Sequence, residues 1–259
     1  MLSGRSLEVA GNSNSRKMII QRHNPAYRPA YCLYRIMIKK IIVPIILSLI
    51  LLLTGCTTKK EIDPETILEN IRKVTVMVYV EDSHASGVIV SNLDDVILIA
   101  TVSHLVEGHD QAIITMPGGE TVFGNVICLD PMKDTALLQI EKQYLDENFI
   151  NNISVSLLSE STIDMVSVED NVYLTGSAVG VSSNVTEGII KSKDYFIPEF
   201  DENLLYIYGD AMAGMSGGGV FTKEGFLIGI IAAGSEASET LAIPISEYVY
   251  DGGKLYDKN

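Results

Sequence analysis

The sequence of 259 residues contains few cysteines, which excludes a disulfide framework as the basis of its fold. The three are Cys32, Cys56 and Cys128, whereas an exported domain held by disulfides has an even set at close spacings. Only Cys128 falls in a part of the sequence patterned like a globular domain. We therefore expect the fold to depend on an apolar core, in which Cys128 is a small buried hydrophobic residue.

Positive charge is also scarce, which argues against a nucleic-acid partner. The sequence has 19 Lys and Arg against 33 Asp and Glu, for a formal net charge of −14. Binding to phosphates needs clustered Lys and Arg side chains, and many of the basic residues here lie before residue 41, ahead of a long apolar run. The rest of the chain is strongly acidic, which favours solubility and indicates little else.

Histidine is rare as well, with four in the chain. No histidine is paired with a cysteine at the spacing of metal ligands, so a zinc site is not expected. We predict neither a metal nor an organic cofactor.

The longest apolar run, IIVPIILSLILLL at residues 41–53, predicts an export signal. Lys39 and Lys40 precede it and Thr54-Gly55-Cys56 follows it, which is the order of a basic region, an apolar region and a small-residue cleavage site. The run has 13 residues, and a transmembrane helix needs about 20. We therefore interpret the run as part of a signal peptide.

The end of this signal, Leu53-Thr54-Gly55-Cys56, resembles the lipobox of bacterial lipoproteins. The resemblance implies cleavage just before Cys56, a lipid on its sulfur, and anchoring of an exported protein to the bacterial membrane, facing outside the cytoplasm. An uncleaved signal anchor with an incidental cysteine is the alternative.

These features divide the chain into four parts. Residues 1–36 are a non-native or disordered upstream extension, because a start at Met37 would give a compact signal peptide. Residues 37–55 are that signal peptide, residues 56–65 carry the lipidated cysteine and a tether, and residues 66–259 form the globular domain.

The globular part is patterned like an all-β protein. A short helix is expected at residues 66–73, and roughly a dozen short β-like runs separated by turn residues follow it. Such spacing is typical of a sandwich or a barrel.

Three segments of this domain carry residues suited to acyl transfer. The strand and turn LIATVSHLV present His104, the segment DPMKD leads Asp134 into an apolar strand, and the turn GMSGG surrounds Ser216. A serine hydroxyl is a poor nucleophile until an imidazole accepts its proton, and a carboxylate on the other imidazole nitrogen fixes the tautomer. Backbone N–H groups in a tight turn then stabilise the oxyanion.

Each of these residues also has a structural interpretation. A Ser-Gly-Gly segment is commonly a loop, a histidine at a strand end is commonly exposed, and Asp130 is expected to be a turn residue. The chain order His, Asp, Ser, with each at a junction between a strand and a turn, favours catalysis. His84 and His109 are weaker candidates for the base, because neither follows a buried strand.

Together the three segments resemble the trypsin-like serine proteases, and in particular their bacterial Deg/HtrA branch. Further matching pieces are ASGVIV from Ala85, TEGII from Thr186, GFLIGI from Gly225 and LAIP from Leu241. The resemblance spans about residues 74–250. It implies an all-β fold of two antiparallel six-stranded β-barrels, at about 66–160 and 161–250, with the active site in the cleft between them.

The resemblance also implies roles for single residues. His104 would be the general base, Asp134 its orienting carboxylate and Ser216 the nucleophile, with the N–H groups of Gly214 and Ser216 forming the oxyanion hole. Met215 stands where digestive-type members place an activating aspartate, so that switch is not expected. Because 43 residues follow Ser216, we also expect no PDZ domain, which many Deg/HtrA members append.

Substrate preference has two interpretations at this stage. Asp210 stands six residues before Ser216, where trypsin-like members place the carboxylate that selects Lys or Arg, whereas Deg/HtrA members usually prefer small aliphatic residues. An extended substrate is expected to pair with the strand formed by Ile231, Ala232, Ala233 and Gly234.

The function expected from these residues is a serine endopeptidase that acts on exported or cell-envelope proteins through an acyl-enzyme. Its partners would be polypeptide substrates and the membrane, through the lipid on Cys56, and the Deg/HtrA resemblance leaves an oligomer open. The alternatives are a catalytically silent, protease-fold lipoprotein that binds peptides, and hydrolysis of a non-peptide ester.

Overall fold

In the computed structural model of the chain, the described residues are 62–158, 162–177, 183–198, 200, 202–250 and 253–254. They belong to one compact unit, Glu61–Asn259. The predicted extension at 1–36, the signal peptide at 37–55 and the lipidated Cys56 lie outside the described residues and stay predictions. None of the helices in the described part is long and apolar enough to cross a membrane.

The described chain begins with helix α3, Pro64–Val74. A proline in the first turn fits a helix start because its missing N–H has no partner there in any case. Ile67, Ile71 and Val74 are buried, and their spacing of four and three residues places them on one side of the helix. This side packs into the core, so α3 is the short helix that the sequence predicts at 66–73.

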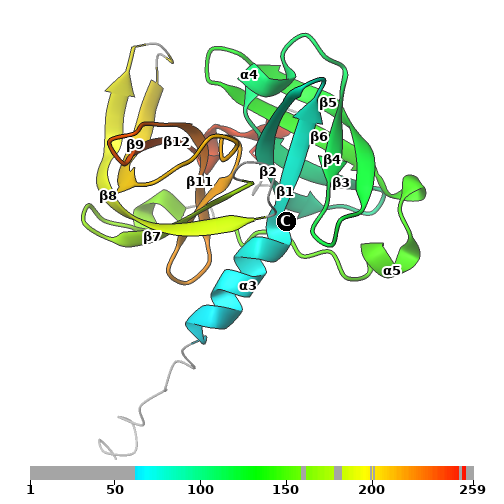
Figure 1. Ribbon diagram of the computed structural model, residues 1–259, viewed down its shortest axis with the longest axis horizontal. Helices are drawn as coiled ribbons and strands as arrows, with labels where there is room; N and C mark the ends of the chain where they lie inside the picture. The colour runs from blue at the N-terminus through cyan, green and yellow to red at the C-terminus, as the bar shows by residue number, and fades with distance from the viewer. Residues whose placement is uncertain are drawn as a thin grey trace, which may run out of the picture. The chain divides into compact units, whose positions relative to one another are not determined.

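The first barrel follows α3 directly, and Figure 1 shows it in cyan and green. Its elements are β1 (Thr75–Val80), β2 (Ser83–Asn92), β3 (Val96–Thr101), α4 (Ser103–Val106), β4 (Gln111–Thr115), β5 (Thr121–Asp130) and β6 (Thr135–Glu141). The strand order is β1-β2-β3-β6-β5-β4, closed by antiparallel pairing of β1 with β4. Inward side chains such as Val78, Ile89, Ile99 and Leu138 are almost completely buried, as the alternation of strand residues in a small barrel requires.

A connecting segment lies between the barrels and contacts both. It contains η3 (Lys142–Tyr144), α5 (Glu147–Ile150) and η4 (Thr162–Met165). The backbone N–H and the hydroxyl of Ser156 both donate to the carbonyl of Ile89 in β2, at 3.0 and 2.8 Å. The next residue, Leu157, accepts a hydrogen bond from Leu227 of the second barrel at 3.0 Å. The connection therefore fixes β2 against the second half of the chain.

The second barrel is built like the first, and its strands run from yellow-green to orange in Figure 1. They are β7 (Asn171–Gly176), β8 (Asn184–Ile197), β9 (Glu202–Gly209), β10 (Gly219–Thr222), β11 (Leu227–Gly234) and β12 (Glu239–Pro244), followed by η6 (Ile245–Glu247), β13 (Val249–Tyr250) and β14 (Gly253–Lys254). The order is β10-β11-β12-β9-β8-β7, closed by β10 with β7. Two closed antiparallel six-stranded barrels confirm the predicted fold class.

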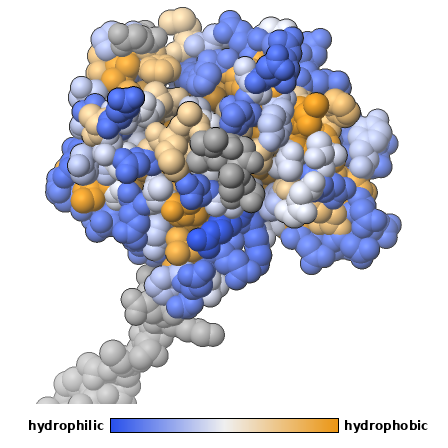
Figure 2. Space-filling model, viewed as in Figure 1, coloured by the Kyte–Doolittle hydropathy of each residue, from blue (hydrophilic) through white to orange (hydrophobic). Residues whose placement is uncertain are grey.

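Hydrophilic side chains cover most of the face of this unit shown in Figure 2, and hydrophobic ones form small separate groups there. Most of the large apolar residues gather instead in two buried clusters, one centred on the first barrel and one inside the second. The catalytic candidates do not belong to these two clusters and lie on the connections between strands.

Candidate catalytic site

His104 and Asp134 meet at one end of the first barrel. β3 is buried and ends at Thr101, and the single turn of α4 then presents His104 with 54% of its side chain exposed. Asp134 lies just before β6 with φ +53°, and its side chain is 6% exposed. Nδ1 of His104 lies 2.9 Å from Oδ2 and 3.1 Å from Oδ1 of this carboxylate.

The carboxylate of Asp134 is held by two further donors. It accepts hydrogen bonds from the hydroxyl of Ser103 at 3.0 Å and from the backbone N–H of His104 at 2.9 Å. Hydrogen bonding to Asp134 raises the pKa of His104 above its ordinary value, against the opposing effect of partial burial. An imidazole whose Nδ1–H faces a carboxylate keeps Nε2 as the proton acceptor.

The turn that carries Asp134 is itself fixed on both sides. Asp130 accepts the N–H groups of Met132 and Lys133 at 3.0 and 3.3 Å, so it is the turn residue that the sequence predicts. Nζ of Lys133 lies 2.7 Å from carboxylate oxygens of both Glu202 and Glu247. Hydrogen bonds to Glu202 and Glu247 raise the pKa of Lys133. This ion-pair network links the Asp134 turn to β9 and η6.

Tyr248 supports the same region from the end of the chain. Its side chain is buried, and its hydroxyl donates to the carbonyl of Thr101 at 2.9 Å. Burial, reinforced by the negative charge of Asp134, raises the pKa of Tyr248 well above its ordinary value. The phenol therefore stays protonated and acts as a donor to the last residue of β3.

Ser216 lies in a tight turn between β9 and β10. Gly214 and Gly217 have φ of +90° and +81°, values that residues with a side chain adopt rarely. A Cβ at Gly214 would lie 2.5 Å from the carbonyl oxygen of Ser177, and a Cβ at Gly217 would overlap the carbonyl oxygen of Ser86. The turn thus needs glycine at both positions, for its conformation and for its close approach to β2.

Within the described residues, no acceptor is found for the N–H groups of Gly214 and Ser216, nor for that of Ala213. The other N–H groups from Met215 to Gly218 are paired, since Met215 donates to Met212 at 3.0 Å, Gly217 to Ile231 at 2.7 Å and Gly218 to Met215 at 2.9 Å. The two N–H groups predicted to form the oxyanion hole are therefore available to a ligand.

The hydroxyl of Ser216 donates to the carbonyl of Ala232 at 3.2 Å. Among the described residues it makes no hydrogen bond to His104. The two elements are nevertheless close, because a Cβ at Gly217 would lie 2.6 Å from the hydroxyl oxygen of Thr101, three residues before His104. Catalytic hydrogen bonds are often long in the absence of substrate and shorten when it binds.

The predicted substrate strand ends beside this turn. Ile231 and Ala232 are buried, whereas Ala233 and Gly234 are exposed. β10 pairs with β11 from Leu227 to Ile230, and Ile231 exchanges backbone hydrogen bonds with Gly217 and Gly218. Within the described chain, the edge of β11 that faces away from β12 therefore has no backbone partner beyond Ile231. An extended peptide could add to that edge.

The segment around Asp210 is exposed and lies close to the predicted substrate strand. Asp210 is exposed, and its carbonyl accepts the hydroxyl of Thr186 at 2.9 Å. Its neighbour Ala211 packs against the substrate strand, because a Cβ on Gly234 would lie 2.6 Å from the carbonyl oxygen of Ala211. Little space is left between these two segments.

The other two histidine candidates occupy different surroundings. Nδ1 of His109 faces the carbonyl of Glu107 at 3.0 Å, and Nε2 lies 3.5 Å from Glu81. His84 lies beside the nucleophile turn, with Nε2 3.0 Å from the position of a Cβ on Gly214. Neither is paired with a buried carboxylate in the described part of the chain.

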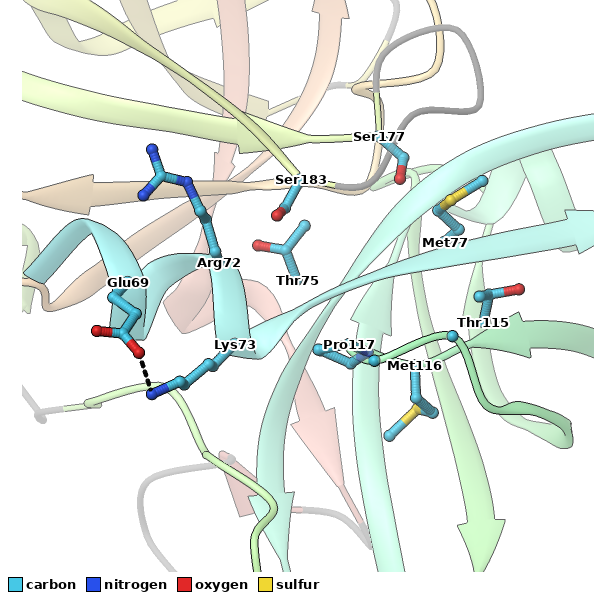
Figure 3. Close-up of a pocket in the computed structure, with 12 residues that line it drawn as sticks. Glu69, Arg72, Lys73, Thr75, Met77, Thr115, Met116, Pro117, Ser177 and Ser183 are labelled. Atoms are coloured by element: carbon cyan, nitrogen blue, oxygen red, sulfur yellow. Dashed lines mark ion pairs between the residues drawn. The ribbon is translucent and has the colours of Figure 1, made fainter. Parts of the chain in front are cut away.

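One cavity in the described part of the chain is separate from the triad residues. It has a volume of about 480 Å³ and lies where the end of α3, β1 and the turn between β4 and β5 meet (Figure 3). Its wall includes Ser177, whose hydroxyl is buried and has no hydrogen-bond partner in the described structure. None of His104, Asp134 and Ser216 lines this cavity.

Comparison with known proteins identifies the family of the chain. Residues 85–230, more than half of the chain, match the model of the trypsin-like peptidase domain. The chain belongs to this family. The matched segment contains all three members of the predicted triad, so the predicted membership of the trypsin-like proteases is confirmed. The lipoprotein signal stays a prediction.

Relatives of this trypsin-like peptidase include HtrA-type proteases. A serine protease HtrA-like from Staphylococcus aureus strain USA300 is 27% identical over 182 residues, which cover 64% of this chain and 23% of that protein. The solved structure of the HtrA-type protease AlgW with a tripeptide is 26% identical, with a TM-score of 0.59, over 70% of this chain and 60% of that one. The serine endoprotease from Yersinia pestis, 23% identical with a TM-score of 0.59 over 70% of this chain and 62% of that one, shares the fold. The peptidase thus spans about a quarter of the length of its curated relatives.

Several supporting residues escaped the sequence analysis. Ser103 could have been suspected, since it is a small polar residue directly before His104. Lys133, Tyr248 and Ser86 act through partners far away along the chain, and no local pattern marks them.

Proposed function

We propose that the protein is a serine endopeptidase that hydrolyses peptide bonds through an acyl-enzyme. The observation that carries the proposal is the buried carboxylate of Asp134 on Nδ1 of His104, in a chain whose Ser216 turn offers two N–H groups without acceptors among the described residues. That combination supplies an orienting carboxylate, a base and an oxyanion site.

In the proposed reaction, Ser216 attacks the carbonyl carbon of the substrate while Nε2 of His104 accepts its proton. The N–H groups of Gly214 and Ser216 bind the negative oxygen of the tetrahedral intermediate. The C–N bond then breaks as His104 returns the proton to the leaving amine. A water molecule, deprotonated by His104, hydrolyses the ester and restores Ser216.

For this reaction, the hydroxyl of Ser216 must leave the carbonyl of Ala232. A rotation about the Cα–Cβ bond of Ser216 breaks that 3.2 Å contact without moving the backbone. A substrate paired with Ala233 and Gly234 also brings its own N–H groups to this strand, so binding can favour the rotation.

We propose a substrate with a small aliphatic residue before the cleaved bond. The support is the close approach of Gly234 to Ala211, which restricts the space for a side chain. Asp210 is exposed, so its carboxylate is hydrated and would attract a basic side chain weakly. We favour this interpretation over the Lys or Arg preference.

The proposed substrates are exported or cell-envelope polypeptides. Support comes from the signal-like segment 37–55 and from the lipobox around Cys56, which would keep the enzyme on the outer side of the bacterial membrane. The similarity to HtrA-type proteases supports a polypeptide substrate.

The decisive experiment treats the full-length chain with a fluorophosphonate probe, which reacts covalently with activated serines. We expect labelling of the unaltered protein and of Ser192→Ala, a change in β8 away from the site, and no labelling of Ser216→Ala. Equal labelling of Ser216→Ala would contradict the assignment of the nucleophile. A folded, unlabelled native chain would favour the peptide-binding alternative.

A further inference from the structure

Ser86, in β2 of the first barrel, touches the nucleophile turn of the second barrel at two points. We propose that Ser86 is a positioning residue that holds the oxyanion hole in its active geometry. This inference rests on the proposed function, because it assigns a role within the same site.

All polar groups of Ser86 are paired, and the residue is completely buried. Its N–H donates to the carbonyl of Ser216 at 2.7 Å, and its hydroxyl donates to the carbonyl of Gly214 at 2.6 Å. The hydroxyl oxygen also accepts the N–H of Ser177 at 2.6 Å. The carbonyl of Ser86 accepts the hydroxyl of Thr101 at 2.7 Å.

These contacts fix two of the peptide planes in the turn. The plane between Gly214 and Met215 is held by Ser86 at its oxygen and by Met212 at its N–H. The plane between Ser216 and Gly217 is held by Ser86 at its oxygen and by Ile231 at its N–H. The plane between Met215 and Ser216, which carries one of the two oxyanion donors, lies between them.

The turn needs such a hold because glycine rotates easily. Gly214 and Gly217 have left-handed φ values, and glycine interconverts between conformations at little steric cost. Without Ser86, the plane that carries the carbonyl of Gly214 would be held only by the hydrogen bond of its N–H to Met212, and its rotation would carry the adjacent planes with it. Oxyanion donors contribute to catalysis only when they are fixed before the charge develops.

Ser86 also relates the turn to the general base. Thr101, which donates to Ser86, is the last residue of β3, and His104 follows it after three residues. One buried serine thus connects the strand that leads to His104 with both carbonyls that flank Met215. A residue that only stabilised the fold would not need to bind both of these carbonyls, which lie next to the oxyanion donors.

The test compares Ser86→Ala with Ser156→Ala in the full-length chain. Ser156 is a matched control, since its buried hydroxyl also donates to a carbonyl, that of Ile89 in β2, away from the turn. For Ser86→Ala we expect kcat to fall by about 10- to 100-fold, less than the loss caused by removing an oxyanion donor itself. KM should change little, and a peptide aldehyde, which forms an oxyanion at the site, should bind more weakly by the same factor as kcat.

A second variant guards against loss of folding. Ser86→Cys replaces the hydroxyl by a thiol, which is a weaker donor. Its kcat should therefore be intermediate between the kcat of the unaltered chain and the kcat of Ser86→Ala. Two results would overturn the inference while leaving the proposed function intact. One is an unchanged kcat in folded Ser86→Ala. The other is an effect of Ser86→Ala that is confined to KM and melting temperature and that Ser156→Ala matches. Absence of probe labelling in the unaltered chain would instead overturn both.

Discussion

One edge of the His104 imidazole faces both oxygens of the Asp134 carboxylate, with Nδ1 2.9 Å from Oδ2 and 3.1 Å from Oδ1. Since Asp134 also accepts from Ser103 and from the backbone of His104, neither side chain can rotate without breaking hydrogen bonds. The pair is preorganised before any substrate arrives.

Asp134→Asn should therefore abolish most activity while keeping the fold. An amide can donate to Nδ1, which would leave the proton on Nε2, the wrong nitrogen for accepting the proton of Ser216. We expect kcat to fall by about 10⁴-fold, the magnitude seen for this change in another Ser-His-Asp enzyme. Peptide hydrolysis measures the loss. Asp130→Asn, in the same turn, is the control and should change kcat little, because asparagine also forms this turn.

The pH dependence should follow His104. Its pKa is raised above the ordinary 6.5 by hydrogen bonding to Asp134, and the base must be neutral to accept a proton. The kcat/KM value should therefore rise with pH through an apparent pKa above 6.5, because kcat/KM reports the free enzyme. A midpoint below 6.5 would contradict the His104–Asp134 pair as the titrating unit.

The same pair should affect stability with the opposite sign. A pKa raised on folding stabilises the native state fully below the unfolded pKa, and this contribution is lost as pH rises through the folded pKa. The melting temperature of the native chain, relative to that of His104→Gln, should thus be highest at acidic pH. A difference in melting temperature between the two proteins that is the same at all pH values would contradict this prediction.

Lys133→Met should loosen the Asp134 turn. The change removes a charge that lies 2.7 Å from both Glu202 and Glu247 and leaves two carboxylates close together. We expect a loss of about 1–2 kcal/mol in unfolding free energy, since the network is partly shielded from solvent. Chemical denaturation measures it, with Lys191→Met as the control. Lys191 pairs with Glu169, which is largely exposed, so that change should cost under about 0.5 kcal/mol.

Asp210→Ala should leave the residue preference unchanged. Asp210 is exposed, and the contact between Ala211 and Gly234 limits the space for long side chains. A peptide library should show cleavage after small aliphatic residues for both proteins. Cleavage after Lys or Arg that disappears in Asp210→Ala would establish the basic-pocket alternative.

The sequence predicts the fold well because barrel strands are short and locally patterned. β3 and β6 are apolar runs that lead into and out of the turns carrying His104 and Asp134, so strands and candidate residues could be placed together. The turn around Ser216 was visible for the same reason, since its glycines are adjacent in sequence.

Contacts between distant segments could not be predicted from the sequence. Ser86 and Gly214 are 128 positions apart, and Thr101 and Tyr248 are 147 apart. Each pair depends on how the two barrels dock, which no local periodicity records. The rotamer of Ser216, bonded to Ala232, is likewise a property of the folded site.

The division of the site between the barrels sets the order in which its parts are made. His104 and Asp134 belong to the first barrel, whereas Ser216 precedes the last three strands of the second. During translation, His104 and Asp134 are added to the chain before Ser216, and the second barrel cannot close until β12 has been made. A chain interrupted before β12 would therefore lack the complete site, and the proposed peptidase activity is expected only after the second barrel has closed.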